Sequence, residues 1–220
     1  MCPLLPTRKP LLCYVTGRRE LSNDPAEAKE LLLYKIAEAS RAGVDWIQLR
    51  EKDLSGRELA QLINEVLRKI GGSCTLLIND RLDAAIANRA AGVHLGEQSL
   101  PLAEANRLCQ ERRSNERFLV GASAHSLVVA QQAEKAGADY LVFGPIFATP
   151  SKAAFGAPQG VGKLREACAG LKIPVIAIGG ITAENYAQCL EAGAAGIAAI
   201  RLFQDAENLP ELVSRLRMGV

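Results

Sequence analysis

Short apolar segments alternate with longer amphipathic or alanine-rich segments along the whole chain. The short segments are rich in β-branched residues, which favours strands, while the longer segments have the length and the composition of helices. The predicted strands are 11–16, 45–50, 75–79, 92–95, 118–123, 140–143, 174–178 and 196–200. The predicted helices are 25–42, 56–70, 82–90, 102–112, 127–136, 162–169, 183–192 and 210–218.

This alternation predicts a parallel sheet with helical crossovers. An Ala-Gly pair before several predicted strands supports it, because glycine suits the left-handed residue that ends a helix; these glycines are Gly43, Gly92, Gly137 and Gly193. Counting gives about eight strand–helix units, so the predicted fold class is α/β, a single (β/α)8 TIM barrel. A doubly wound open sheet is the alternative, but the first predicted strand is not followed by a Gly-rich dinucleotide fingerprint.

The same pattern predicts one domain without an internal linker. The barrel is expected to occupy residues 11–220, and residues 1–10, which contain three prolines, are expected to form a flexible N-terminal extension.

Composition excludes several classes of protein. Of 220 residues, 49% are hydrophobic and 23% are charged, which is ordinary for a globular protein. A net charge of only +2 and 5% aromatic residues argue against a nucleic-acid partner, and there is neither a membrane span nor a signal-peptide core. The six cysteines form no C-x-x-C pair and are expected to be reduced, which predicts a cytoplasmic protein. The expected partners are small-molecule substrates, and a homo-oligomer is left open.

Polar residues gather where predicted strands end, which is where TIM barrels carry their chemistry. Gln48, Arg50 and Lys52 alternate with period two, so they face one side if the strand continues that far. Inward cations are costly unless they serve a ligand, and an anionic ligand would explain them. The alternative is a solvated loop with local ion pairs.

The next strand ends carry candidates for metal binding and proton transfer. Asn79 and Asp80 either cap a helix or offer oxygen ligands to Mg²⁺. His94 is as compatible with a structural role as with a functional one. His125 follows a predicted strand and is a candidate for proton transfer, or else a residue of the next helix cap.

Two anion-binding regions are predicted at the mouth of the barrel. The first would use side chains, namely Arg50, Lys52, Thr149, Ser151 and Lys152. The second would use backbone N–H groups around Gly179 and Gly180, before a predicted helix, together with the eighth strand. For the residues after Pro145 an ordinary turn is the alternative. Two such regions suggest two phosphorylated substrates, or one substrate with two anionic ends.

These motifs, taken together, resemble the superfamily of thiamin phosphate synthases and thiazole tautomerases, and the synthases most closely. The resemblance runs from about residue 11 to about residue 205 and rests on Gln48–Lys52, Asn79-Asp80, Gly92–Gly96, Ser123–Ser126, Gly144–Phe147 with Thr149 and Lys152, Gln159-Gly160 and Ile178–Ile181. It implies that hydroxymethylpyrimidine pyrophosphate condenses with a thiazole phosphate to give thiamin phosphate and pyrophosphate.

The resemblance also implies roles for individual residues. The implied catalytic residues are Arg50, Lys52, Ser123, His125 and Lys152. The implied substrate-binding residues are Gln48, Arg50, Lys52, Asn79, Ser123, Thr149, Ser151, Lys152, Gly179, Gly180 and Arg201.

Two residues depart from the family pattern. Ser99 stands where the family has a second metal-binding aspartate, so one Mg²⁺ per subunit would be held by Asp80 with Ser99 or Glu97, and more weakly. Arg201 replaces a small residue, usually serine, and would either contact the thiazole phosphate or block its site. These departures keep two alternatives open: a thiazole tautomerase-like enzyme acting on thiazole carboxylate phosphate, with His125 as its acid/base, and a non-catalytic binder of thiamin-pathway metabolites.

Overall fold

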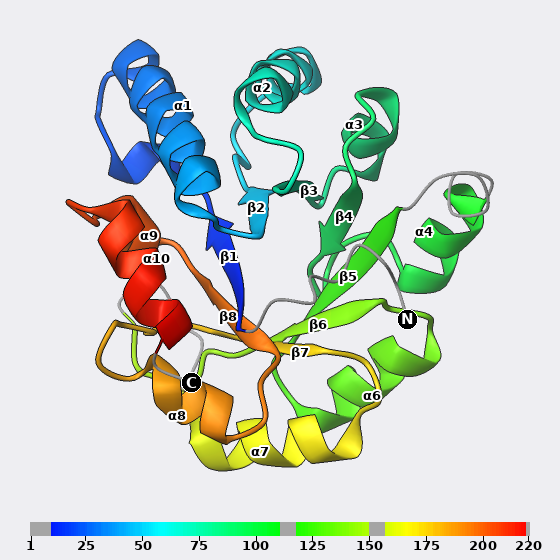
Figure 1. The fold of residues 1–220 in the computed structure, drawn as a ribbon. Coiled ribbons are helices and arrows are strands. Elements are labelled where there is room, and N and C mark those ends of the chain that lie inside the picture. The colour runs from blue at the N-terminus through cyan, green and yellow to red at the C-terminus, as the bar shows by residue number, and fades with distance from the viewer. Residues whose placement is uncertain (1–9, 111–117, 150–156, 219–220) are drawn as a thin grey trace.

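Eight parallel strands close into one barrel, in chain order from β1 to β8, with β8 paired to β1 (Figure 1). The structure is a computed structural model that describes residues 10–110, 118–149 and 157–218. The strands are β1 (Leu11–Val15), β2 (Trp46–Leu49), β3 (Thr75–Asn79), β4 (Gly92–Leu95), β5 (Leu119–Ala124), β6 (Tyr140–Phe143), β7 (Val175–Ile178) and β8 (Gly196–Ala199). The predicted (β/α)8 barrel is confirmed.

Helices surround the barrel in Figure 1. They are η1 (Arg18–Glu20), α1 (Pro25–Ala42), α2 (Gly56–Lys69), α3 (Leu82–Ala87), α4 (Leu102–Leu108), α6 (Leu127–Lys135), α7 (Gly160–Gly170), α8 (Tyr186–Glu191), α9 (Arg201–Gln204) and α10 (Leu209–Met218). Local sequence explains their ends. Ser55 and Glu58 form a capping box at the start of α2. None of the helices in the described ranges has the length and apolarity needed to cross a bilayer.

The predicted helix-ending role of glycine is confirmed at three positions and wrong at the fourth. Gly43, Gly137 and Gly193 have φ values of 95°, 87° and 99°, in the left-handed region. Gly92 is instead the first residue of β4, and the left-handed residue before that strand is Arg89, with φ of 56°. Gly92 is needed for close packing, because a Cβ there would lie 2.4 Å from the carbonyl oxygen of Leu119.

Two short helices, η1 and α9, were not predicted, because three or four residues are too few to show a helical period. The predicted N-terminal extension lies outside the described residues, apart from Pro10.

The barrel interior is filled beneath its C-terminal mouth by two large aromatic side chains. Trp46 and Tyr140 are fully buried, and their ring centroids are 4.7 Å apart. Gly121 makes room for them, since a Cβ at that position would lie 2.0 Å from Cζ of Tyr140. This packing gives the mouth of the barrel a solid floor.

Candidate active site

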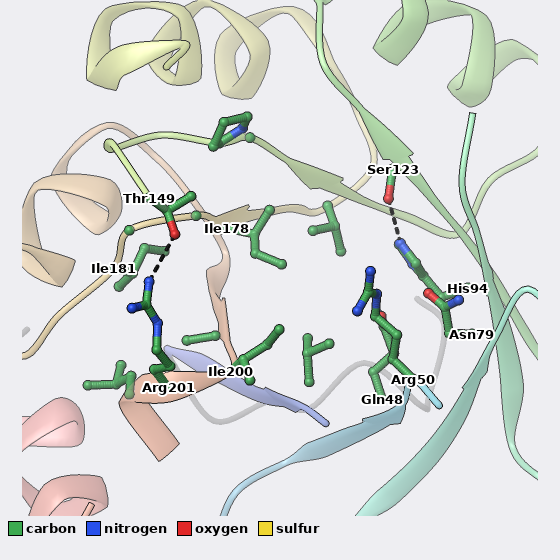
Figure 2. Close-up of a pocket in the computed structure, with 18 of the residues that line it drawn as sticks. Gln48, Arg50, Asn79, His94, Ser123, Thr149, Ile178, Ile181, Ile200 and Arg201 are labelled. Carbon is green, nitrogen blue, oxygen red and sulfur yellow. Dashed lines mark hydrogen bonds between the residues drawn. The ribbon is translucent and has the colours of Figure 1, made fainter. Parts of the chain in front are cut away.

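A cavity of about 440 Å³ opens at the C-terminal ends of the strands. The strand residues that line it lie at the last or the next-to-last position of their strands, namely Val15, Gln48, Asn79, His94, Ser123, Val142, Ile178 and Ala199. Figure 2 shows two groups of polar side chains, with Ile178 and Ile200 between them. One group, the Arg50 side, contains Gln48, Arg50, Asn79, His94 and Ser123; the other, the Arg201 side, contains Thr149 and Arg201.

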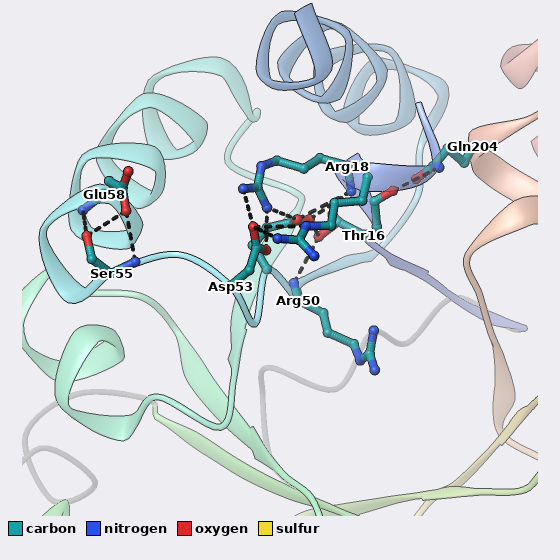
Figure 3. A network of polar contacts seen from close by, with 10 residues as sticks. Thr16, Arg18, Arg50, Asp53, Ser55, Glu58 and Gln204 are labelled. Carbon is teal, nitrogen blue, oxygen red and sulfur yellow. Dashed lines mark hydrogen bonds and ion pairs between the residues drawn. The ribbon is translucent and has the colours of Figure 1, made fainter. Parts of the chain in front are cut away.

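The Arg50 side depends on a buried polar network behind it (Figure 3). Strand β2 ends at Leu49, and the backbone N–H of Arg50 donates a 2.9 Å hydrogen bond to Oγ1 of Thr16. The hydroxyl of Thr16 donates in turn to the Glu51 carboxylate, at 2.6 Å. Thr16 and Glu51 are both buried. The loop after β2 is thereby tied to the end of β1, while the Arg50 guanidinium extends away from the network and lines the cavity.

Arg18 completes this network. Its guanidinium contacts Oε2 of Glu51 at 2.9 Å and both carboxylate oxygens of Asp53, at 2.7 and 2.6 Å. The hydrogen bonds from Arg18 lower the pKa of Asp53 to about 2. Glu51 and Asp53 are therefore paired with the Arg18 guanidinium, which does not line the cavity.

Strand alternation predicted that Lys52 would share the face of Gln48 and Arg50 if the strand continued that far. Lys52 does not share that face. It lies in the turn after β2, is not among the residues lining the cavity, and has a side chain that is 59% exposed. The prediction was wrong because extended backbone stops at Leu49. The Lys52 ammonium lies 3.8 Å from Oδ2 of Asp80 instead.

Asp80 is the centre of a small polar cluster beside the cavity. Its carboxylate accepts hydrogen bonds from the side chains of Asn79 and Ser99 and from the backbone N–H of Gly96. Burial raises the pKa of Asp80, but these donors and Lys52 outweigh it, so the pKa lies below its usual value. Asp80 has a φ of 62°, a left-handed conformation that aspartate tolerates better than most residues.

The Ser99 hydroxyl therefore contacts the carboxylate of Asp80, the residue that the resemblance implies as its partner in the metal site. Glu97 points elsewhere: its Oε1 accepts a 2.9 Å hydrogen bond from the backbone N–H of His125. Within the described residues, no group of three or more His, Cys, Asp or Glu side chains is arranged to hold a metal ion.

On the Arg201 side, Nη2 of Arg201 donates a 3.1 Å hydrogen bond to Oγ1 of Thr149. Thr149 thus lies across the cavity from Arg50 rather than beside it (Figure 2). Gly179 and Gly180 have φ values of 97° and 66°, and a Cβ on either would approach the loop after β6 to about 2.5 Å, so both must be glycine.

At these two glycines the backbone N–H groups are available to an anion, whereas the carbonyl groups already accept hydrogen bonds. The carbonyl of Gly179 accepts from the Phe147 N–H, and that of Gly180 from the Asn185 side chain. The helix expected to begin at residue 183 begins only at Tyr186. The helix N-terminus predicted behind the glycines is therefore replaced by a turn that Asn185 closes on Thr182.

The two histidines are both at the cavity, in different settings. The imidazole of His125 contacts the carbonyl oxygen of Gly144 through Nδ1. His94 is 3% exposed, with Nε2 at 2.9 Å from Oγ of Ser123 and Nδ1 at 3.2 Å from the Tyr140 hydroxyl. Burial lowers the pKa of His94 to about 4, so the ring is neutral at physiological pH.

Most of the predicted site residues are brought together. Those that line the cavity are Gln48, Arg50, Asn79, Ser123, His125, Thr149, Gly179, Gly180 and Arg201, while Lys52, Asp80, Glu97 and Ser99 lie outside its lining. Ser151 and Lys152 fall outside the described residues. Sequence reasoning assigned no role in the site to Thr16, Glu51 and Tyr140, whose polar groups lie behind the lining.

The fold and the cavity define a TIM-barrel enzyme whose candidate active site has an arginine at each of two opposite sides. The particular family follows from comparison with known proteins. A family model described as thiamine monophosphate synthase matches residues 13–203. The chain therefore belongs to the thiamine monophosphate synthase family, whose members are transferases.

Individual relatives match over most of the chain. The chain is 41% identical to the thiamine-phosphate synthase of Chlorobium luteolum over 214 residues, covering 96% of this chain and 92% of that protein. It is 42% identical to the thiamine-phosphate synthase of Moorella thermoacetica over 182 residues, covering 81% and 83%. Among solved structures, the thiamine phosphate pyrophosphorylase of Pyrococcus furiosus superposes with a TM-score of 0.78 and 32% identity, covering 97% of both chains.

Proposed function

We propose that this cavity joins hydroxymethylpyrimidine pyrophosphate to a thiazole phosphate, giving thiamin phosphate and pyrophosphate, which is the reaction of the family. One observation carries the proposal: a single cavity has a guanidinium at each of two opposite sides, with Ile178 and Ile200 between them. Two anionic groups at the sides and two flat rings in the middle fit that distribution of charge.

The Arg50 side takes the pyrophosphate. Arg50 and the amide of Asn79 provide donors to phosphate oxygens, and Lys52 adds a cation beside Asp80. Ser151 and Lys152, which the resemblance implies as further donors to the pyrophosphate, lie outside the described residues. The network of Thr16 and Glu51 holds the Arg50 backbone, so the guanidinium is positioned before substrate arrives.

Mg²⁺ fits the Arg50 side only when substrate phosphate oxygens complete its ligands. Asp80 and Ser99 supply one carboxylate and one hydroxyl in mutual contact, which matches the habit of Mg²⁺ of using one or two carboxylates together with substrate phosphates. Bound there, Mg²⁺ would neutralise charge on the departing pyrophosphate. Glu97 is not part of this ligand pair, because its carboxylate serves the His125 amide.

The reaction needs stabilisation of a leaving group more than it needs a base. The bond between the pyrimidine methylene and the pyrophosphate oxygen breaks, with the electron pair leaving on pyrophosphate, and the lone pair of the thiazole nitrogen forms the new C–N bond. Arg50 faces the charge that develops on pyrophosphate. Gln48 and Ser123 orient the pyrimidine, and the apolar middle of the cavity keeps water from the methylene cation.

The Arg201 side takes the thiazole phosphate. The guanidinium of Arg201, oriented by Thr149, and the N–H groups of Gly179 and Gly180 are its donors. His125 lines the same cavity, and its Nδ1 is already used by Gly144, which leaves Nε2 as the ring nitrogen for a substrate. We place the enzyme in the cytoplasm, where the five described cysteines, all free thiols, would remain reduced.

The test measures pyrophosphate release from the purified protein with both substrates and Mg²⁺. Wild type should release pyrophosphate only when both substrates are present, and Arg50→Ala should lower kcat by roughly 100- to 1000-fold, as for loss of one group that stabilises developing charge. Arg19→Ala is the matched control, because Arg19 lies in η1, has an exposed side chain and does not line the cavity. Absence of pyrophosphate release by wild type, or an Arg50→Ala variant as active as Arg19→Ala, would overturn the proposal.

A further inference from the structure

Three polar side chains form a hydrogen-bonded chain that leads from the buried floor of the barrel to the cavity. Tyr140 on β6 contacts Nδ1 of His94 on β4 through its hydroxyl, at 3.2 Å, and Nε2 of His94 contacts Oγ of Ser123 on β5, at 2.9 Å. His94 and Ser123 line the cavity, whereas Tyr140 is fully buried. Figure 2 shows the last link of this chain, between His94 and Ser123.

The chain is held rigidly at its buried end. The His94 ring stacks on Tyr140 with centroids 5.7 Å apart and an interplanar angle of 27°. Trp46 packs against the Tyr140 ring, and Gly121 leaves only the space that this ring fills. These contacts hold the Tyr140 ring in a position from which its hydroxyl reaches Nδ1 of His94.

This geometry decides which nitrogen of His94 carries the proton. A neutral imidazole has one N–H donor and one acceptor nitrogen. If Nδ1 carried the proton, the Tyr140 O–H would be a buried donor with no acceptor recorded among the described residues, which is unfavourable. Trp46 offers no remedy, because an indole N–H can only donate. Tyr140 therefore donates to Nδ1, and the His94 proton is on Nε2, where it is donated to Ser123.

We propose that Tyr140 and His94 are positioning residues that make Ser123 a hydrogen-bond donor toward the substrate. Because Oγ of Ser123 already accepts the Nε2–H of His94, the hydroxyl proton of Ser123 points into the cavity. The site then selects a ring that presents an acceptor, such as an aromatic nitrogen, at that point and disfavours one that presents an N–H. The choice of a pyrimidine as that ring rests on the proposed function.

The direct test is the tautomer of His94, read by long-range ¹H–¹⁵N correlation in histidine-labelled protein without substrate. The chain has only two histidines, so two rings appear. We expect the Nε2–H tautomer for His94 and the Nδ1–H form for His125, whose partner, the carbonyl of Gly144, can only accept. Loss of one ring in His125→Asn assigns the pair. A His94 ring protonated on Nδ1, or on both nitrogens at neutral pH, would refute the proposal.

A variant pair tests the consequence for the substrate. Tyr140→Phe keeps the aromatic ring but removes the hydroxyl, so His94 should populate both tautomers and the KM for the pyrimidine substrate should rise several-fold, with the KM for the thiazole phosphate unchanged. Tyr14→Phe is the matched control, because it removes another buried phenol hydroxyl, one that bonds Gln204 instead. If Tyr140→Phe and Tyr14→Phe change the KM for the pyrimidine substrate equally, and the KM for the thiazole phosphate equally, Tyr140 has no positioning role.

Substitution of His94 itself separates hydrogen-bond polarity from packing. His94→Gln can accept from Tyr140 through its carbonyl and donate to Ser123 through its NH₂ group, so it should retain much of the pyrimidine affinity that His94→Leu loses. Equal losses in the two variants would contradict the inference. The tautomer is read without turnover, so failure of the proposed reaction and failure of this inference give different results.

Discussion

Arg201 stands where the family resemblance implies a small residue, usually serine. Its guanidinium lines the cavity and is oriented by Thr149. The geometry places it facing the cavity as a donor, which favours phosphate binding over the alternative that Arg201 blocks the site.

Arg201→Ser, which restores the usual family residue, should therefore raise the KM for the thiazole phosphate by roughly 10- to 100-fold, the loss expected for a charged hydrogen bond. The KM for the pyrimidine pyrophosphate should stay constant. Steady-state kinetics with each substrate varied in turn measures both values. A lower KM for the thiazole phosphate in Arg201→Ser would mean that the arginine obstructs the site.

Ser99 is the second departure, and its contact with Asp80 makes it testable at the level of a single charge. Ser99→Asp should lower the Mg²⁺ concentration that gives half-maximal activity, because a second carboxylate raises affinity for a hard cation. Ser99→Asn is the neutral control of similar size. If the aspartate and asparagine variants need the same Mg²⁺ concentration as wild type, the Asp80–Ser99 pair is not the metal site.

At the scale of elements, the loops after β1 and β2 act as one unit. Thr16 accepts the Arg50 N–H and donates to Glu51, so one hydroxyl joins the two loops on which the Arg50 side depends. Removing it leaves the backbone N–H of Arg50 without its acceptor and takes one donor from the Glu51 carboxylate, which keeps Arg18.

Thr16→Val preserves the shape of the side chain and removes the hydroxyl. We expect it to lower kcat roughly tenfold or more, through a displaced Arg50, while the KM for the thiazole phosphate is unchanged. Thr16→Ser keeps the hydroxyl and should restore most of the activity. The position is structural only, without effect on Arg50, if Thr16→Val lowers the free energy of unfolding but leaves kcat at the wild-type value.

At the scale of the whole molecule, the floor of the barrel connects stability to the site. Gly121→Ala should destabilise the protein by roughly 1–3 kcal/mol, because its Cβ would overlap the Tyr140 ring and that ring has no free space to move into. Gly72→Ala is the control, since a Cβ there meets nothing within 4 Å. Urea unfolding measures both variants, and equal free energies of unfolding would show that the floor yields easily.

The sequence was most informative where the conformation of a residue depends on its neighbours along the chain. The alternation of strands and helices, the helix-ending Gly43, Gly137 and Gly193, and the polar residues at strand ends are all local patterns, and the barrel follows from them. The misplaced features are the ends of elements: β2 stops at Leu49, after which the Arg50 N–H bonds Thr16, and α8 starts at Tyr186, after the turn that Asn185 closes on Thr182.

By itself, then, the sequence determined the barrel, the end of the barrel that carries the chemistry and the family to which the chain belongs. Only the tertiary structure decided which polar groups meet: Thr149 with Arg201, Lys52 with Asp80, and Thr16 with the Arg50 backbone. The physical reason is that strand register and loop path set these distances, and both depend on packing between segments far apart in the chain. The Tyr140–His94–Ser123 chain, built from three strands, belongs wholly to that second category.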